Sequence, residues 1–122
     1  MSRSHKIAVI DDDETVRDSL RALLEAHSFA VADFGDGDSF LDRHRDTAAD
    51  CVILDVHMPG KTGLDVLKAL RDAGDMTPVI LITGRSDRLI EAKAKVEASV
   101  TILDKPVAQA LLFRAIDSAL AS

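Results

Sequence analysis

Four places in the sequence carry the side chains that phosphoryl transfer requires. They are the acidic pair Asp11-Asp12, Asp55, Thr83 and Lys105. An aspartate carboxylate can attack phosphorus and form an aspartyl phosphate. A lysine ammonium can neutralise a phosphoryl oxygen as a point charge, and a threonine hydroxyl can donate a hydrogen bond to another. Because this chemistry needs mainly positioning and charge stabilisation, these groups would suffice if the fold brought them together.

Asp11, Asp12 and Asp55 would form a site for a divalent cation if they met. Carboxylates close together repel one another, which raises their pKa and destabilises the fold when no cation is bound. A set of oxygen ligands with no soft donor favours Mg²⁺, which keeps some of its waters and commonly holds a phosphoryl oxygen as well. Asp13 follows the pair, and we expect its carboxylate to cap the next helix.

Five short apolar runs are predicted to be the strands that position these groups. Most are rich in β-branched residues and continuous rather than alternating, which is typical of a parallel sheet covered on both faces. The five runs are Ile7–Ile10, Ala30–Ala32, Cys51–Leu54, Val79–Ile82 and Val100–Leu103.

The segments between the runs have helical periodicity. The clearest stripes are Val16-Leu20-Leu23-Leu24, Leu64-Leu67-Leu70 and the run of apolar residues from Ala108 to Ala119. Weaker ones span about 37–46 and 87–97, where Leu89, Ala92 and Val96 share a face. The order (βα)₅ predicts an α/β fold with a doubly wound, five-stranded parallel sheet. Functional groups gather at the carboxyl ends of such strands, so the four places should converge.

The composition indicates one soluble domain over residues 1–122. The chain is 47% apolar, and 15 basic against 21 acidic residues give a net charge of −6. This acidity and the lack of Trp and Tyr argue against direct nucleic-acid binding, which needs excess positive charge or stacking rings. The lone Cys51 excludes an internal disulfide and a cysteine-rich zinc site. With no apolar stretch long enough for a signal peptide or a membrane span, we expect a cytoplasmic protein.

The motifs at the strand ends resemble those of one known family. In order they are Val9-Ile10-Asp11-Asp12-Asp13, Leu54-Asp55-Val56-His57-Met58-Pro59-Gly60, Gly63, Ile82-Thr83-Gly84 and Asp104-Lys105-Pro106. Together they are similar to the response-regulator receiver domain of two-component signalling, a CheY-like domain, over nearly the whole chain. The segment Ile82-Thr83-Gly84-Arg85-Ser86-Asp87 is most similar to the corresponding segment of FixJ/NarL-type or hybrid-kinase receivers. The resemblance implies a flavodoxin-like strand order 2-1-3-4-5.

The resemblance also implies a role for each matching residue. Asp55 would be the phosphoacceptor. Asp12 would bind Mg²⁺ directly, Asp11 mostly through water, and the backbone carbonyl of His57 would add a further ligand. Thr83 would be the switch hydroxyl that turns toward the phosphoryl group.

Lys105 would contact the phosphoryl group, and its bond to Pro106 would be cis, which is affordable only before proline. Arg85 matches a position that affects the lifetime of the phosphoryl group in this family. The His57 side chain would be exposed beside the phosphorylation site and would tune the access of water to it.

The sequence departs from the family pattern in its switch region. Ile102 stands where the family usually has Tyr or Phe as a rotamer switch coupled to the threonine, and an aliphatic chain cannot make the same swing. Val107 replaces a frequent Phe, and Ala98-Ser99-Val100 replaces a small turn that often contains glycine. The phosphorylation residues are therefore complete, while the readout differs from the usual one.

We expect a phosphoacceptor switch rather than an enzyme. A histidine kinase or histidine phosphotransfer protein would phosphorylate Asp55, and the change would reach a homodimer or a downstream output domain. Catalysis would be limited to self-directed phosphotransfer and autodephosphorylation.

Three alternatives remain open at this point. A pseudo-receiver would bind partners without phosphorylation. A haloacid-dehalogenase-type phosphatase would carry a second acid two residues after the nucleophile, where this chain has His57. A flavodoxin-like nucleotide binder would need a Gly/Ser/Thr loop after the first strand, where this chain has Asp11-Asp12-Asp13, which would repel a bare phosphate.

Overall fold

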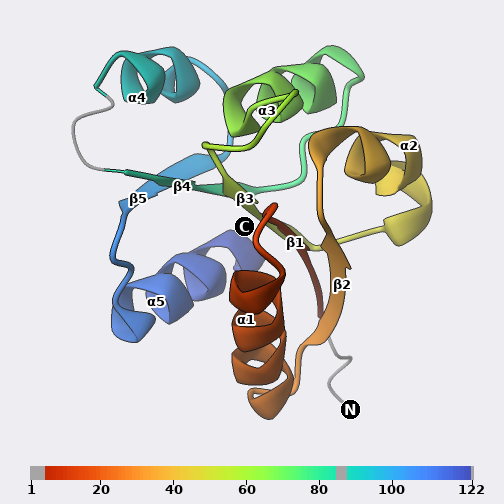
Figure 1. Cartoon of the computed structure of the whole chain (residues 1–122), viewed down its shortest axis with the longest axis vertical. Helices are drawn as coiled ribbons and strands as arrows, with labels where there is room; N and C mark the ends of the chain where they lie inside the picture. The colour runs from red at the N-terminus through yellow and green to blue at the C-terminus, as the bar shows by residue number, and fades with distance from the viewer. Residues whose placement is uncertain (1–4, 85–87, 122) are drawn as a thin grey trace.

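The fold is a five-stranded parallel sheet between two layers of helices (Figure 1). The computed structural model describes residues 5–84 and 88–121. The elements alternate along the chain: β1 (Lys6–Ile10), α1 (Glu14–Ala26), β2 (Ala30–Phe34), α2 (Gly37–Thr47), β3 (Cys51–Asp55), α3 (Gly63–Asp72), β4 (Val79–Thr83), α4 (Arg88–Lys95), β5 (Val100–Asp104) and α5 (Gln109–Leu120). The strand order is β2-β1-β3-β4-β5, which confirms both the predicted α/β class and the flavodoxin-like order.

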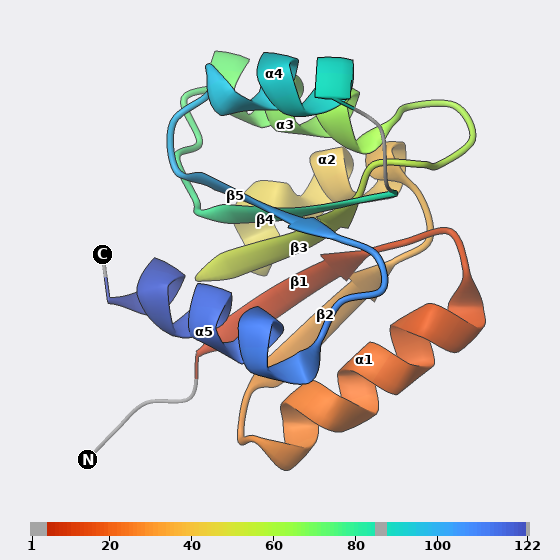
Figure 2. The ribbon, with the colours of Figure 1, turned by 90° about the vertical axis from the view of Figure 1, so that its left-hand side faces the viewer.

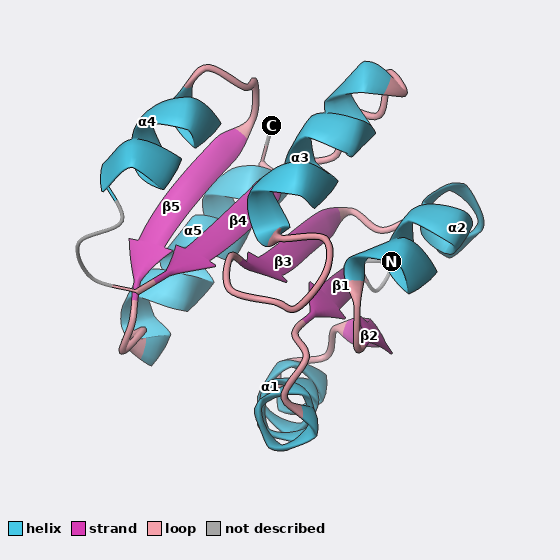
Figure 3. Cartoon of the chain, turned by 45° about the horizontal axis from the view of Figure 1, so that its top comes forward, coloured by secondary structure: helices cyan, strands magenta, loops and turns pink. Residues whose placement is uncertain are grey.

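Each face of the sheet has its own hydrophobic core. Helices α1 and α5 cover one face, and α2, α3 and α4 cover the other (Figures 2 and 3). Successive side chains of β1 serve the two cores in turn: Ile7 packs in the α1/α5 layer and Ala8 in the α2/α3/α4 layer. Strands β3 and β4 are buried along their whole length, which explains why their sequences are continuous apolar runs.

Side-chain caps begin α1, α2 and α3, and those of α1 and α3 fix the loops that carry the acids. The Asp13 carboxylate accepts hydrogen bonds from the amides of Thr15 (2.9 Å) and Val16 (3.4 Å), so its predicted capping role is confirmed. Thr62 and Asp65 form a reciprocal capping box at the start of α3. The loops from β1 to α1 and from β3 to α3 therefore have defined ends.

Helix α4 presents its apolar face differently from the pattern in the sequence. Leu89 and Val96, which share a face with Ala92, are 69% and 79% exposed. Ile90 and Ala94 pack against the core instead. The helix has eight residues and ends at Lys95, so Val96 lies beyond it.

The turn before β5 departs from the glycine-containing family turn in a way that Arg71 accommodates. Ser99 adopts a left-handed backbone with φ of 58°. Arg71 is only 9% exposed. Its guanidinium donates to the backbone carbonyls of Ala98 (3.0 Å) and Ser99 (3.3 Å). It also donates to the carbonyl of Asp75 at 2.8 Å. Arg71 thus joins α3 to the turn that positions β5.

A glycine at the start of α3 lets the chain pass very close to the end of β3. A Cβ atom on Gly63 would lie 2.3 Å from the backbone oxygen of Asp55 and 2.8 Å from Cα of Val56. The Gly63 amide donates to the Val56 carbonyl at 3.0 Å, which closes the loop between them. Only a residue without a side chain fits there.

Within residues 5–84 and 88–121, no helix is both long enough and apolar enough to span a bilayer.

We expect Gly63→Ala to destabilise the fold by about 3 kcal/mol, because the added methyl meets backbone atoms that cannot rotate away. Urea unfolding monitored by circular dichroism would measure the loss. Gly84→Ala is the matched control, since its Cβ would meet only the His57 ring at an ordinary 3.7 Å. Equal stability of the two variants would contradict the close approach.

A second prediction concerns Asp75, which ties α2 to the loop after α3. Its carboxylate lies 2.7 Å from Nδ1 of His44 and accepts from the Thr77 amide (3.0 Å) and hydroxyl (2.6 Å). Burial alone would raise the pKa of Asp75, but the hydrogen bonds from Thr77 and His44 outweigh it and lower the pKa below its ordinary value. The stabilisation is therefore present above the unfolded-state pKa and lost as pH falls through the folded one.

Accordingly, Asp75→Asn should cost about 1–2 kcal/mol at pH 7, and this difference from wild type should shrink below about pH 4. Denaturant unfolding over pH 3–8 tests it. The exposed Asp72→Asn is the control, and a loss at Asp75 that stays constant with pH would refute the interpretation.

Candidate functional site

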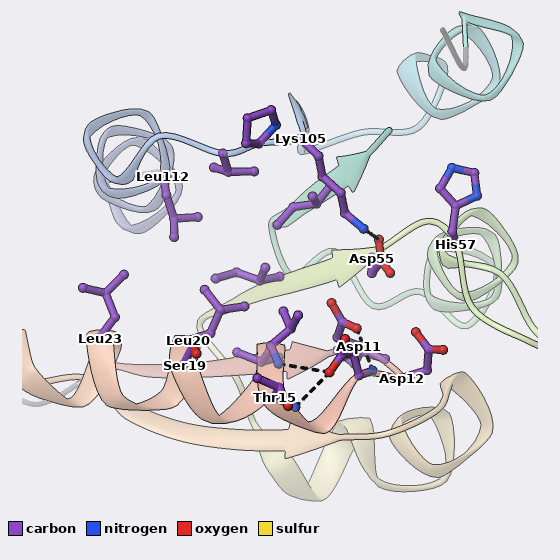
Figure 4. A pocket seen from close by; sticks show the side chains of 18 of the residues that line it. Asp11, Asp12, Thr15, Ser19, Leu20, Leu23, Asp55, His57, Lys105 and Leu112 are labelled. Carbon is purple, nitrogen blue, oxygen red and sulfur yellow. Dashed lines mark hydrogen bonds and ion pairs between the residues drawn. The ribbon is translucent and has the colours of Figure 1, made fainter. Parts of the chain in front are cut away.

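The carboxyl ends of β1, β3 and β5 open into a hollow of about 880 Å³. Figure 4 shows Asp11, Asp12, Asp55 and Lys105 pointing toward one another at one end of it. The other end runs between α1 and α5 and is lined by Leu20, Leu23 and Leu112. The sequence places these polar groups far apart, and the parallel sheet brings them to one edge.

Three carboxylates form a compact cluster at this edge. One oxygen each from Asp11, Asp12 and Asp55 lies within 4.8 Å of the others. Asp55 is only 4% exposed and Asp11 only 7%, whereas Asp12 is exposed. The predicted meeting of the acidic pair with Asp55 is therefore present in the structure.

The environment of Asp11 disfavours its ionised form. Burial raises the pKa of this carboxyl most, the hydrogen bond from the Asp13 amide to Oδ1 (2.9 Å) lowers it, and the charge of Asp55 raises it. Lys105 lowers the pKa and Asp12 raises it by smaller amounts, and the net pKa of Asp11 lies above its ordinary value. A cation bound at the cluster would relieve this cost.

The buried Oδ1 of Asp55 has one partner among the described residues. The Lys105 ammonium lies 3.0 Å from it as an ion pair. The Lys105 side chain is 47% exposed, so water screens the pair. A buried carboxylate whose one ammonium partner is half in water, beside two further carboxylates, fits a hard divalent cation such as Mg²⁺.

Lys105 is held at the edge by its backbone. Its amide donates to the Thr83 carbonyl at 2.8 Å, which extends the pairing of β4 and β5 by one residue. The Lys105–Pro106 peptide bond is cis, as the resemblance implies.

Thr83 lies at the expected strand end, but its hydroxyl is directed elsewhere. The side chain is fully buried, and Oγ1 donates to the carbonyl of Gly84 at 2.7 Å. Thr83 does not line the hollow that holds Asp55. The structure thus brings Asp11, Asp12, Asp55 and Lys105 together and leaves the Thr83 hydroxyl turned to its own loop.

The remaining predicted residues surround this centre. His57 is exposed, lines the hollow and stands beside the acids in Figure 4. Ile102 is half-buried and packs against the core under α3 and α4, paired in register with Leu81. Arg85 lies outside the described residues.

Sequence reasoning missed one residue that contacts the acidic loop. Arg17 on α1 donates from Nη1 to the backbone carbonyl of Asp11 at 2.8 Å and from Nε to Oδ2 of Asp33 at 3.3 Å. The feature of the sequence that could have indicated this role is the position of Arg17 one helical turn after the Asp13 cap, with Asp33 in the following strand. Both contacts depend on how β1 and β2 pair, which no local pattern reveals.

Comparison with protein families agrees with this geometry. The family described as response regulator receiver domain matches residues 7–117. The chain is 36% identical over 120 residues to the transcriptional regulatory protein FixJ of Bradyrhizobium diazoefficiens, covering 98% of this chain and 58% of that protein. It is 35% identical over 118 residues to the response regulator protein TodT of Pseudomonas putida, covering 97% and 52% respectively. The chain therefore spans about half the length of these curated relatives.

Solved structures show the same architecture. The crystal structure of FixJ-N superposes with a TM-score of 0.90 at 28% identity and covers 98% of this chain and 96% of that one. Full-length FixJ from B. japonicum superposes with a TM-score of 0.89 at 35% identity, covering 98% of this chain and 59% of that one. The resemblance to FixJ-type receivers is thereby confirmed. From the site, the fold and these relatives together, the chain belongs to the response-regulator receiver domain family.

Proposed function

We propose that Asp55 is the phosphoacceptor of this receiver domain and that its phosphorylation requires Mg²⁺. The observation that carries the proposal is the cluster of Asp11, Asp12 and the buried Asp55, in which one carboxylate oxygen from each residue lies within 4.8 Å of the others. The Lys105 ammonium lies 3.0 Å from Oδ1 of Asp55. Three clustered carboxylates with one ammonium beside them favour a bound cation.

The proposed step is an in-line transfer between two nucleophiles. A carboxylate oxygen of Asp55 attacks phosphorus of a phosphohistidine on a kinase or phosphotransfer protein. The new O–P bond forms as the P–N bond breaks, and the released imidazole nitrogen takes the electron pair and then a proton from solvent. The product is an aspartyl phosphate on Asp55.

Mg²⁺ would be held by Asp11, Asp12, Asp55 and the backbone carbonyl of His57. When bound, it would neutralise the three carboxylates and the charge on the transferred phosphoryl oxygens. Lys105, already 3.0 Å from Asp55, keeps its ammonium beside those oxygens throughout the step. The phosphoryl donor would approach Asp55 from the hollow that Asp55 lines together with Asp11, Asp12 and Lys105.

Thr83 and Ile102 would convert the chemical step into a change of shape. The Thr83 hydroxyl would leave the Gly84 carbonyl and donate to a phosphoryl oxygen, shifting the loop that leads to α4. Ile102 packs against the same core as Ile90 of α4, so it would follow by repacking rather than by the ring rotation of Tyr or Phe. His57 and Arg85 would modulate how long the phosphoryl group persists.

The relatives support a place in two-component signalling. FixJ and TodT are named as a transcriptional regulatory protein and a response regulator, and this chain matches about half of each. We therefore propose that residues 1–122 form a single receiver domain. It takes its phosphoryl group from a histidine kinase or histidine phosphotransfer protein. Phosphorylation then drives formation of a homodimer or acts on a downstream output domain. Receiver domains are generally not enzymes acting on a separate substrate, and any hydrolysis would be autodephosphorylation of Asp55.

Intact-mass spectrometry after incubation with acetyl phosphate tests the phosphoacceptor. We expect one phosphoryl adduct on wild type that requires Mg²⁺ and that is absent from Asp55→Asn. Asp72→Asn, which removes the same charge at an exposed position that does not line the hollow, is the control and should label like wild type. An unlabelled wild type, under conditions that label a known receiver, would favour a pseudo-receiver. An adduct that persists in Asp55→Asn would place the acceptor elsewhere.

Thermal unfolding with and without Mg²⁺ tests the cation site. In the absence of the cation, Asp12→Asn should raise the Tm by about 2 °C, because it removes one charge from a repelling trio. Wild type should gain about 2.7 kcal/mol when Mg²⁺ reaches a hundred times its Kd, and the variant should lose most of that gain. The exposed Asp18→Asn on α1 is the control. A wild type unresponsive to millimolar Mg²⁺ would contradict the site.

A further inference from the structure

Arg17 connects the acidic loop to the second strand through one guanidinium. Its Nη1 donates to the backbone carbonyl of Asp11 at 2.8 Å, and its Nε lies 3.3 Å from Oδ2 of Asp33 in β2. The side chain is 16% exposed, so these bonds are largely shielded from water. A Cβ on Gly35 would lie 3.3 Å from Nη1, which shows how closely the chain surrounds the guanidinium.

The carbonyl that Arg17 holds belongs to the peptide unit joining Asp11 to Asp12. Because a peptide unit is planar, fixing its oxygen fixes the direction in which the chain leaves Asp11 and enters Asp12. The other contacts of Asp11 are the bond from its amide to the Phe34 carbonyl (3.2 Å) and the bond from the Asp13 amide to its Oδ1 (2.9 Å). Neither of these bonds involves the peptide oxygen. Arg17 is therefore the side chain that determines the orientation of that peptide.

The guanidinium is itself fixed by Asp33. That carboxylate accepts from Arg17 and also from Nη2 of Arg21 at 2.5 Å. The hydrogen bond from Arg21 lowers the pKa of Asp33 below its ordinary value, so Asp33 is ionised. Arg21 thus also pairs with Asp33. Its other partner is the Glu25 carboxylate, whereas the other partner of Arg17 is the Asp11 carbonyl. Two carboxylates therefore face the two guanidinium groups.

We propose that Arg17 is a positioning residue for the divalent-cation site. It holds the Asp11–Asp12 peptide so that both carboxylates face Asp55, and it thereby sets the affinity for Mg²⁺. This inference rests on the proposed function of the site. It concerns a residue outside the acids, the threonine and the lysine that carry out the transfer.

Two effects of removing Arg17 oppose each other, and they can be separated. Loss of a positive charge near the acids would strengthen cation binding. Loss of the bond to the peptide would loosen the ligands and weaken binding, and partners of metal ligands typically contribute about 10–100-fold to affinity. We expect the positional effect to be the larger of the two, and a variant that keeps the charge isolates it. Arg17→Lys keeps the charge and loses the fork that bonds two acceptors at once.

The experiment is a Mg²⁺ titration followed by the NMR shifts of the amides of residues 11–13, with Arg21→Gln as the matched control. We expect Arg17→Gln and Arg17→Lys each to weaken Mg²⁺ binding about tenfold, and Arg21→Gln to leave it unchanged. With acetyl phosphate, the Arg17 variants should need correspondingly more Mg²⁺ for half-maximal labelling and should reach the wild-type rate at saturation. Thermal unfolding checks that each variant is folded, and Arg17→Lys serves if Arg17→Gln is not.

Unchanged or tighter Mg²⁺ binding by the Arg17 variants would overturn the inference, because charge alone would then account for the residue. An equal loss in Arg21→Gln would also overturn it, since the shared ion pair to Asp33 would then be responsible. If wild type binds no Mg²⁺, the proposed function fails and this inference with it. If wild type binds and labels normally while the variants match it, only the inference fails.

Discussion

Repulsion among three carboxylates at one edge of the sheet is the constraint around which the rest of this structure is arranged. Asp11 and Asp55 are almost fully buried, and their oxygens lie within 4.8 Å of each other and of Asp12. Lys105 offsets the repulsion only in part, because half of its side chain is in water. The fold must therefore supply the stability that keeps the acids together, and it does so from the fully buried strands β3 and β4 beneath them.

The loops that carry the acids are held by backbone contacts rather than by contacts between the acids. Gly63 lets α3 start against the carbonyl of Asp55, and Asp13 begins α1 directly after the acidic pair. Arg17 holds the peptide between Asp11 and Asp12. Oδ1 of Asp11 accepts from the Asp13 amide, and Oδ1 of Asp55 pairs with Lys105. The contacts of Gly63, Asp13 and Arg17 leave the second oxygen of each acid available to a cation and a phosphoryl group.

The sequence was sufficient to predict the features that depend on local patterns. Runs such as Cys51–Leu54 are continuous and apolar, and in a parallel sheet the residues after the runs lie at the same edge. The meeting of Asp11, Asp12, Asp55 and Lys105 could therefore be predicted. The rotamer of Thr83, the exposed face of α4 and the bonds of Arg17 could not. Each depends on contacts between segments that are distant in the sequence, and hydrophobic periodicity does not predict such contacts.

The two ends of the sheet edge differ in how firmly they are held, and this difference indicates where a signal would leave the site. On the β1–β2 side, Asp33 ties two arginines of α1 to the strand. On the β4–β5 side, α4 buries only Ala94 fully and exposes Leu89. The bond from Thr83 to the Gly84 carbonyl is a single contact, so exchanging it for one to a phosphoryl oxygen costs little. Elements of low local stability are the ones that move in a switch, and α4 is therefore the element through which the proposed phosphorylation would be read.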